Sequence, residues 1–339
     1  MVSIKKVNTV IVGQGIAGSL LAFMLHRKKI PFLLIDPSVP QTASQIAAGM
    51  FTPLSGKRKT IHPLSLQQIP FAINIYKEIS KLIGYNILHL TNIYQLFDSV
   101  EEQSQLQRKY LEPSFAPYIK SISNYLSGTN IYCGAYEVTH SGWVNCEYWM
   151  KFFKIWLKKN GRLLEAKFVH QNLQIKEDRM EYNGIEFENI FFCEGYKAIN
   201  NPFFNEIIIP CKGDVLTIAS EHFTTDQIVK KNGIYLVPIE SYSFKAGATY
   251  QWNNDSETPD QAAKLLIEGQ LKNMLTNPFE IINHQSAIRP TTQNREVIAR
   301  QHQHHKGMYM FNGLGTKGVL QGPWWADRIV ALSLQLDLE

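Results

Sequence analysis

A glycine-rich turn near the start of the chain has the residue types and the spacing that bind a dinucleotide. The short β-branched segment Val7 to Val12 precedes the turn GQGIAG at 13–18, and an apolar helical pattern follows it. A second apolar run, Phe32 to Ile35, ends at Asp36. A strand, a glycine turn, a helix and a second strand, with an acid about 20 residues beyond the turn, form the fingerprint of a dinucleotide-binding βαβ unit.

The small residues of this turn each have a physical task in that interpretation. Gly13 permits the tight turn, Gly15 lets backbone N–H groups approach a pyrophosphate, and Gly18 lets the helix pack closely on the strand. The helix opens at Ile16 and Ala17, where unpaired N–H groups and the positive end of the helix dipole can face the phosphates.

Asp36 can act in two ways. Its carboxylate can accept hydrogen bonds from the ribose hydroxyls of an adenosine, which is the role of the acid in the fingerprint. It can also be a turn residue before Pro37. The ribose role is favoured because the acid ends the second strand of the βαβ unit, and the turn role stays open.

The composition limits the classes of protein that remain. The 339 residues are enough for about two domains of roughly 150 residues each. Hydrophobic residues at 45% and charged residues at 19% are typical of a globular protein and exclude a disordered or coiled-coil chain. The net charge is only +5, and the longest basic cluster is Lys57-Arg58-Lys59, so a nucleic-acid partner is not indicated.

Metal binding and targeting signals find no support. The cysteines lie far apart without a C-x-x-C motif, which favours a reducing compartment, and His302, His304 and His305 are more typical of a solvated hairpin loop than of a metal site. The apolar run before Leu25 is interrupted by polar and glycine residues, unlike a signal peptide. No run reaches the roughly 18 apolar residues of a membrane span, so we expect a cytoplasmic protein.

The elements that must position the turn alternate between strands and helices, as in an α/β protein. A second region of the chain has the pattern of antiparallel strands. Helices are predicted at 66–82, 100–110, 143–159 and 261–275, and from 318 through 334. Strands are predicted at 187–193, 215–218, 234–237, 242–249, 288–300 and 308–312. A second glycine turn, Gly313 to Gly318, opens the last helix, where N–H groups can again meet negative charge.

An ordered set of motifs resembles the D-amino-acid oxidase family of FAD-dependent oxidoreductases, which includes glycine oxidase, sarcosine oxidase and the oxidase domain of a bifunctional tRNA-wobble-uridine enzyme. The motifs are, in chain order, VIVGQGIAGSLLAFML, SQIAAGMFTP, IFFCEGYKA, PCKGDVLTI, IYLVP with KAGATY, AIRPTTQNREVIAR and GLGTKGVLQGP. Each is weak alone, but seven in order along nearly the whole chain are specific.

The resemblance implies a Rossmann-like FAD-binding domain of the glutathione-reductase type, interleaved with an α+β substrate domain on a mostly antiparallel sheet. The FAD-binding domain is expected at 1–85, 140–205 and 285–339, and the substrate-binding domain at 86–139 and 206–284. The residues that the resemblance places at FAD, beyond those of the first turn, are Ser44, Ala47, Ala48, Gly49, Gly195, Gly313, Gly315, Thr316, Lys317 and Gly318.

The resemblance also implies a substrate pocket. Arg289 matches the arginine that binds the substrate carboxylate, a task that suits a planar bidentate donor, although a structural arginine before Pro290 is the alternative. Tyr235 matches a tyrosine whose hydroxyl reaches the same carboxylate, and Tyr250 and Met50 match pocket walls. Aromatic residues at alternating strand positions are also common in cores, so both interpretations stay open for the tyrosines.

The implied reaction is oxidation of the C–N bond of a small amino acid or secondary amine, with hydride transfer to flavin N5 and hydrolysis of the imine. FAD is expected to be non-covalent, because Cys211 is the last cysteine and nothing matches the anchoring cysteine of sarcosine oxidase. The electron acceptor, oxygen or another, and the oligomeric state stay open.

Two other functions remain as alternatives. GLGTKG at 313–318 and the basic cluster at 57–59 suggest an FAD enzyme that oxidises carboxymethylaminomethyl-uridine in tRNA. A dinucleotide-binding module without catalysis is the other.

Overall fold

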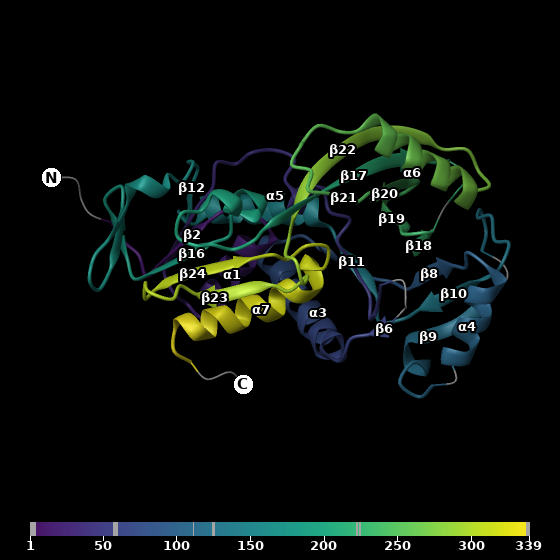
Figure 1. Ribbon diagram of the computed structural model, residues 1–339, viewed down its shortest axis with the longest axis horizontal. Coiled ribbons are helices and arrows are strands. Elements are labelled where there is room, and N and C mark those ends of the chain that lie inside the picture. Colours follow the sequence, from purple (N-terminus) through teal and green to yellow (C-terminus); the bar gives the residue numbers. More distant parts are fainter. Residues whose placement is uncertain are drawn as a thin grey trace.

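Two lobes lie side by side along the long axis of the molecule, as the computed structural model shows (Figure 1). One lobe is built on a six-stranded sheet and the other on a nine-stranded sheet. The structure describes residues 5–56, 60–110, 112–123, 126–221, 223 and 225–336, so the basic cluster at 57–59 lies outside the described residues.

The six-stranded sheet contains the predicted βαβ unit. Its order is β12-β3-β2-β16-β24-β23, and all neighbours are parallel except β23 and β24. The strands are β2 (Thr9–Val12), β3 (Phe32–Ile35), β12 (Leu163–Leu164), β16 (Asn189–Phe192), β23 (Ile298–Gln301) and β24 (Met308–Asn312). The strands β2, β3, β16 and β24 are buried along their whole length, which explains their nearly continuous apolar sequences.

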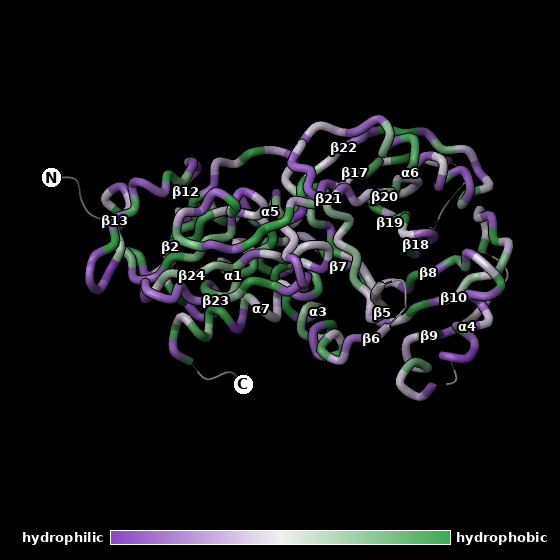
Figure 2. The backbone as a smooth tube through the Cα atoms, viewed as in Figure 1, coloured by the Kyte–Doolittle hydropathy of each residue, from purple (hydrophilic) through white to green (hydrophobic). Residues whose placement is uncertain are grey.

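Four helices share a hydrophobic core with one face of this sheet. They are α1 (Ile16–Arg27), α3 (Pro63–Ile83), α5 (Cys146–Lys159) and α7 (Gly318–Ser333), and their core residues include Leu20, Ile75, Trp149 and Ile329. Figure 2 shows hydrophobic segments gathered around α1 and hydrophilic segments in the outer loops. No helix of the described residues is long and apolar enough to cross a membrane.

A small sheet shares a second core with the other face of the six-stranded sheet. Val10 and Leu33 face this core, whereas Ile11 and Leu34 face the helices, which is the alternation expected of a strand buried on both faces. The small sheet has the order β1-β15-β14-β13, from β1 (Lys5–Lys6), β13 (Leu173–Ile175), β14 (Met180–Tyr182) and β15 (Ile185–Phe187).

The nine-stranded sheet forms the second lobe. All its pairings are antiparallel except that of β18 with β8, and β22 pairs with β17 beside the main path β21-β17-β20-β19-β18-β8-β10-β9. The strands are β8 (Ile93–Leu96), β9 (Ile119–Ser123), β10 (Ala135–Val138), β17 (Ile209–Ala219), β18 (Ile228–Lys231), β19 (Ile234–Glu240), β20 (Ser243–Gly247), β21 (Gln251–Trp252) and β22 (Glu280–Thr291). Helix α6 (Gln261–Met274) covers one face, and α4 (Val100–Tyr110) lies beside β9 and β10 (Figure 1).

Short elements connect the two lobes. They are α2 (Ala43–Ile46), β4 (Met50–Phe51), β5 (Leu54–Ser55), β6 (Thr60–Ile61), β7 (Leu88–Leu90) and β11 (Gly142–Val144), with the sheets β4-β11-β7 and β5-β6. The helix predicted from 143 begins instead at Cys146, because the Asn145 side chain caps it by accepting from Tyr148 N at 3.1 Å. Residues 142–144 pair as β11 between the other two strands.

The chain passes between the two large sheets more than once. It builds β2 and β3, leaves for β8 to β10, returns for β12 and β16, leaves again for β17 to β22, and ends in β23, β24 and α7. The predicted boundary at 285 falls inside β22, and the domain boundaries themselves stay a prediction.

Replacing Gly18 by alanine should destabilise the fold. A Cβ at Gly18 would lie 1.9 Å from Gly13 O, so the helix would have to move off the turn, which typically costs about 1–3 kcal/mol. The control is Gly269→Ala, an exposed position inside α6 with nothing within 4 Å, where alanine should be neutral or stabilise by up to about 1 kcal/mol. Urea unfolding midpoints measure both, and a Gly18→Ala protein as stable as the parent would contradict the close packing.

Candidate functional site

The first glycine turn is held against two other segments of the chain. Gly13 has a φ of 102°, and a Cβ there would lie 2.5 Å from Cys193 O. Ile16 N, in the first turn of α1, donates to Ser44 Oγ at 2.9 Å, and a Cβ at Gly15 would lie 3.0 Å from the same oxygen. The structure therefore brings Ser44, a predicted FAD residue, to the predicted phosphate turn.

The Asp36 carboxylate connects the glycine turn to the end of β3. Its Oδ2 accepts from Gln14 N at 2.7 Å, and its Oδ1 accepts from Ser38 N at 2.6 Å. The turn role that the sequence left open is thus present. Each carboxylate oxygen has a second acceptor direction, so these bonds leave room for a ribose hydroxyl.

The N-termini of α1 and α7 meet at this point, although the two helices come from opposite ends of the chain. A Cβ at Gly318, the first residue of α7, would lie 3.5 Å from Ile16 Cδ1, the first residue of α1. Within the described chain, neither helix has a side-chain N-cap or an acid in its first turn. Two positive helix ends without internal compensation are well suited to a phosphate or another anionic group.

The second glycine turn is anchored to the segments around it. Gly315 N donates to Pro290 O at 3.0 Å, and Asn312 Nδ2 donates to Gly195 O at 2.9 Å. Asn312 Oδ1 also accepts from Gly313 N at 2.9 Å, so one buried amide orients both predicted glycine positions. Sequence reasoning missed Asn312, and its only signal was a polar residue at the end of an apolar strand.

The segment Ala47 to Met50 is fixed on β11. Val144 N donates to Gly49 O at 3.0 Å, and Met50 pairs with Trp143. Ala48 is buried in the core beneath this segment, while Met50 is half-buried against the same core as Tyr235. Thr316 is exposed and Lys317 is half-buried at the start of α7.

Arg289 lies flat against the backbone of the neighbouring strand. A Cβ at Gly213 would lie 2.2 to 2.4 Å from the guanidinium, so only glycine leaves this space. Arg289 Nη1 donates to Thr249 O at 3.2 Å, and its guanidinium lies 4.7 Å from the centroid of the Tyr250 ring. Among the described residues Arg289 has no acidic partner, unlike Arg300, which pairs with Glu206.

Tyr235 lies close to this arginine. Burial raises the pKa of the Tyr235 hydroxyl well above its usual value, an effect that the positive charge of Arg289 opposes and Tyr250 adds to. The hydroxyl is therefore protonated at neutral pH and is a hydrogen-bond donor. The structure thus places the predicted residues Arg289, Tyr235 and Tyr250 close together, with Met50 at the core that Tyr235 joins.

A buried acid stands behind Arg289 on the opposite face of the sheet. Asp214 is fully buried, and its carboxylate accepts from Asp260 N at 2.9 Å and from Thr249 Oγ1 at 3.3 Å, with His284 Nε2 at 3.0 Å. Thr249 therefore bonds Asp214 with its hydroxyl and Arg289 with its carbonyl. Sequence reasoning missed Gly213, Asp214 and His284, whose roles depend on the pairing of β17 with β22.

A buried lysine ties the second lobe to α2 and α5. Lys245 Nζ lies 3.2 Å from Glu147 Oε2 and 3.5 Å from Ile46 O. The histidine cluster has a structural role in part, because His302 Nε2 bonds Phe203 O at 2.8 Å.

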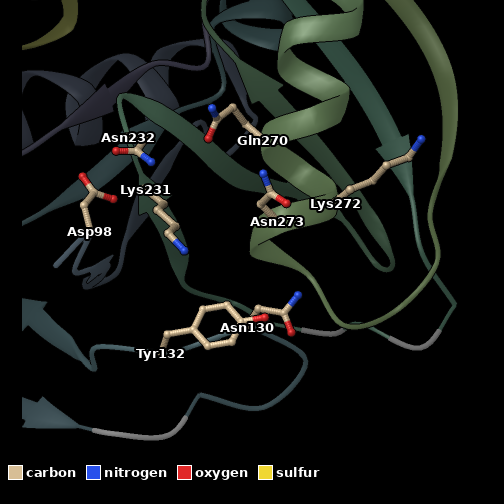
Figure 3. A pocket seen from close by; sticks show the side chains of 8 residues that line it. All are labelled: Asp98, Asn130, Tyr132, Lys231, Asn232, Gln270, Lys272 and Asn273. Atoms are coloured by element: carbon tan, nitrogen blue, oxygen red, sulfur yellow. The ribbon is translucent and has the colours of Figure 1, made fainter.

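An open cavity of about 370 Å³ lies elsewhere, between α6 and the end of β18 (Figure 3). Its lining is polar and contains none of the predicted site residues: Asp98, Asn130, Tyr132, Lys231, Asn232, Gln270, Lys272 and Asn273.

The βαβ unit with two converging helix N-termini defines an α/β dinucleotide-binding protein. Residues 8–332 match the family model described as FAD dependent oxidoreductase, DAO. The chain therefore belongs to this family of FAD-dependent oxidoreductases, and the predicted cofactor and enzyme class are confirmed at this level.

Solved structures confirm the predicted fold. Glycine oxidase from Geobacillus kaustophilus aligns with a TM-score of 0.82 at 17% identity, covering 98% of this chain and 96% of that one. Iminodiacetate oxidase from Chelativorans sp. BNC1 aligns equally well, with a TM-score of 0.82, 17% identity and the same coverage of 98% and 96%. At these identities the likeness establishes the fold alone.

A sequence relative is a larger protein. The chain is 21% identical over 354 aligned positions to the tRNA 5-methylaminomethyl-2-thiouridine biosynthesis bifunctional protein of Marinobacter nauticus. The alignment covers 94% of this chain and 55% of that protein, so the chain spans about half the length of this relative.

Replacing Asp214 by asparagine should destabilise the second lobe. An amide offers one acceptor oxygen where the carboxylate now serves Asp260 N, Thr249 and His284, so a buried partner loses its bond at a cost of about 1–3 kcal/mol. Glu177→Gln also replaces a carboxylate by an amide, but at an exposed site. It is the control and should change stability by less than about 0.5 kcal/mol. Equal denaturation midpoints for the two variants would refute the role of Asp214.

Proposed function

We propose that the protein uses non-covalent FAD to oxidise the C–N bond of a small amino acid or secondary amine that carries a carboxylate. The observation that carries this proposal is the environment of Arg289. Its guanidinium is fixed by Thr249 O, by the backbone at Gly213 and by the Tyr250 ring, without an acidic partner among the described residues. A held but unpaired guanidinium is what a carboxylate requires for bidentate binding.

The residues around the first turn fit FAD. The N-termini of α1 and α7 offer N–H donors and positive dipole to anionic parts of the cofactor, and Asp36 retains acceptor capacity for a ribose hydroxyl. Three of the four cysteines are buried, and Cys133 is half-buried. FAD supplies the redox chemistry by accepting a hydride from the carbon that bears the amine.

The chain's own residues would orient the substrate. Arg289 binds the carboxylate, and the protonated Tyr235 hydroxyl donates a further hydrogen bond to it. Fixing the carboxylate at these donors sets the position of the adjacent carbon, and pre-orientation of this kind lowers the entropic part of the barrier. Tyr250 and Met50 would line the pocket, and the imine product is hydrolysed by the water that reaches it.

Oxidation of a tRNA nucleotide is the second candidate. It is supported by the sequence relative, a protein of tRNA 5-methylaminomethyl-2-thiouridine biosynthesis, and by the GLGTKG turn at 313–318. Salt-dependent binding of unmodified tRNA would favour it, and the absence of binding at low salt would exclude it. If the protein binds FAD but no amine reduces that flavin, the non-catalytic dinucleotide-binding module is favoured.

Arg289 variants test the principal proposal. Arg289→Ala should weaken binding of a non-oxidisable carboxylate such as N-acetylglycine by about 10- to 100-fold, because a charge-assisted bidentate pair contributes about 1.5–3 kcal/mol. Arg289→Lys should recover only part of the affinity, since an ammonium lacks the planar fork. The measurement is a titration followed by the change in the visible spectrum of the bound flavin.

Arg108→Ala is the matched control, because Arg108 is an exposed arginine on α4, outside the predicted pocket. Its carboxylate affinity should equal that of the parent. If Arg289→Ala binds the carboxylate as tightly as this control, Arg289 is the structural arginine of the alternative interpretation.

A further inference from the structure

Two further positively charged residues, Arg295 and Lys317, lie beside Arg289. The Arg295 guanidinium lies 5.7 Å from the centroid of the Trp252 ring, and its backbone has a φ of 61°, a conformation that glycine or asparagine adopts more easily. Lys317 is the N-cap residue of α7. Burial lowers the pKa of Lys317, and the nearby charge of Arg295 lowers it further. The two cations are therefore close enough to repel each other.

Strand register places Trp252, the ring beside Arg295, on the same face of the sheet as Arg289. Cys211 pairs with Trp252 on one side and with Arg289 on the other, and directly opposed residues point to the same face. Arg289 and Arg295 both oppose the rise that burial causes in the pKa of the Cys211 thiol. The guanidinium groups of Arg289 and Arg295 thus both lie near the thiol of Cys211, which stands between Trp252 and Arg289 in the sheet.

The second glycine turn holds Lys317 near the same place. Gly315 N donates at 3.0 Å to the carbonyl oxygen of Pro290, the residue that follows Arg289 in the chain. A Cβ at Gly313 would lie 3.2 Å from Glu296 O, which shows that the turn packs on the segment carrying Arg295. Two backbone contacts therefore fix the distance between the last helix and the arginines.

The charge of this group is not compensated. In the part of the chain that the structure describes, Arg289, Arg295 and Lys317 form no ion pair, and the first turn of α7 has no acid. The adjacent Glu296 carboxylate instead accepts from Asn294 Nδ2 at 2.5 Å. Like charges held together raise the energy of the empty site, and an anion removes that cost when it binds.

The group is open to solvent. The rings beside the arginines are half-exposed, at 51% for Tyr250 and 45% for Trp252. A ligand can therefore reach Arg295 and Lys317 while its carboxylate occupies Arg289. One carboxylate uses one guanidinium, so two cations remain for another group of the same molecule.

We propose that Arg295 and Lys317 form a subsite for a second anionic group of the substrate. The substrate is then an amine or amino acid with at least two anionic groups, the second being a carboxylate or a phosphate, rather than a monocarboxylate such as glycine. This inference rests on the proposed function, because it assumes that Arg289 binds the first carboxylate.

Two matched substrates test the subsite. N-(2-carboxyethyl)glycine and N-propylglycine have the same chain length and differ in one terminal charge. The parent holoenzyme should reduce its flavin with the dianionic amine at least about tenfold more efficiently, measured as the rate constant over the apparent dissociation constant under anaerobic conditions. N-(2-phosphonoethyl)glycine, as a third substrate, distinguishes a phosphate-type from a carboxylate-type preference.

Substitution then assigns the preference to the proposed residues. Arg295→Gln should lower the ratio between the two substrates about tenfold, whereas Arg108→Gln on α4 should leave it unchanged. Raised ionic strength should lower the ratio in the parent. A ratio near one in the parent, or one that Arg295→Gln does not change, would overturn the subsite.

The outcomes for the two proposals are separable. If both amines reduce the flavin equally well, the proposed function stands and the subsite fails. If no amine reduces the flavin, the proposed function fails. If Lys317→Met loses FAD and Arg295→Gln retains full discrimination, Lys317 binds the cofactor and the subsite is again refuted.

Discussion

The contact between the N-termini of α1 and α7 is the constraint on which the rest of the site depends. Gly318 approaches Ile16 here, and one turn further along α7 a Cβ at Gly322 would lie 2.6 Å from Leu20 Cδ1. Two helices that begin at the two ends of the chain are therefore locked together through small residues. The segments between them build both lobes, and the two large sheets alternate along the sequence.

The same contact sets the position of the substrate residues relative to the helix ends. The turn before α7 is bonded to Pro290 O, and Pro290 follows Arg289 on β22. Arg289 is thus carried by the nine-stranded sheet but is held within one residue of an attachment to the other lobe. On the far side of that sheet, Asp214 fixes Thr249, whose carbonyl accepts from Arg289. Arg289 is thus held on one side through the attachment at Pro290 and on the other through Thr249, which Asp214 fixes in place.

Local patterns in the sequence predict much of the fold. The strands β2 and β3, the helix α4 and the helix α6 lie within a residue or two of their predicted positions, since each combines a clear periodicity with a start or stop signal. The start of α5 is different because Asn145 caps the helix after residues 142–144 have paired with β4 and β7, and such pairing is not visible in a local apolar pattern. The site shows the same division: the glycine turns and Arg289 follow from motifs, whereas Gly213, Asp214 and Asn312 depend on partners 35 or more residues away, with Asn312 also bonding the adjacent Gly313.

We expect this chain to hold a flavin that an amine carboxylate reduces. The most direct measurement is an anaerobic screen of the purified holoprotein against amino acids, N-substituted glycines and modified nucleosides, followed by visible absorbance. At least one amine carboxylate should bleach the flavin, an electron acceptor should restore the colour, and denaturation should release FAD into solution. A protein that purifies without flavin, or whose flavin stays oxidised with every amine carboxylate, would show that the chain is not an FAD-dependent oxidoreductase of amine carboxylates.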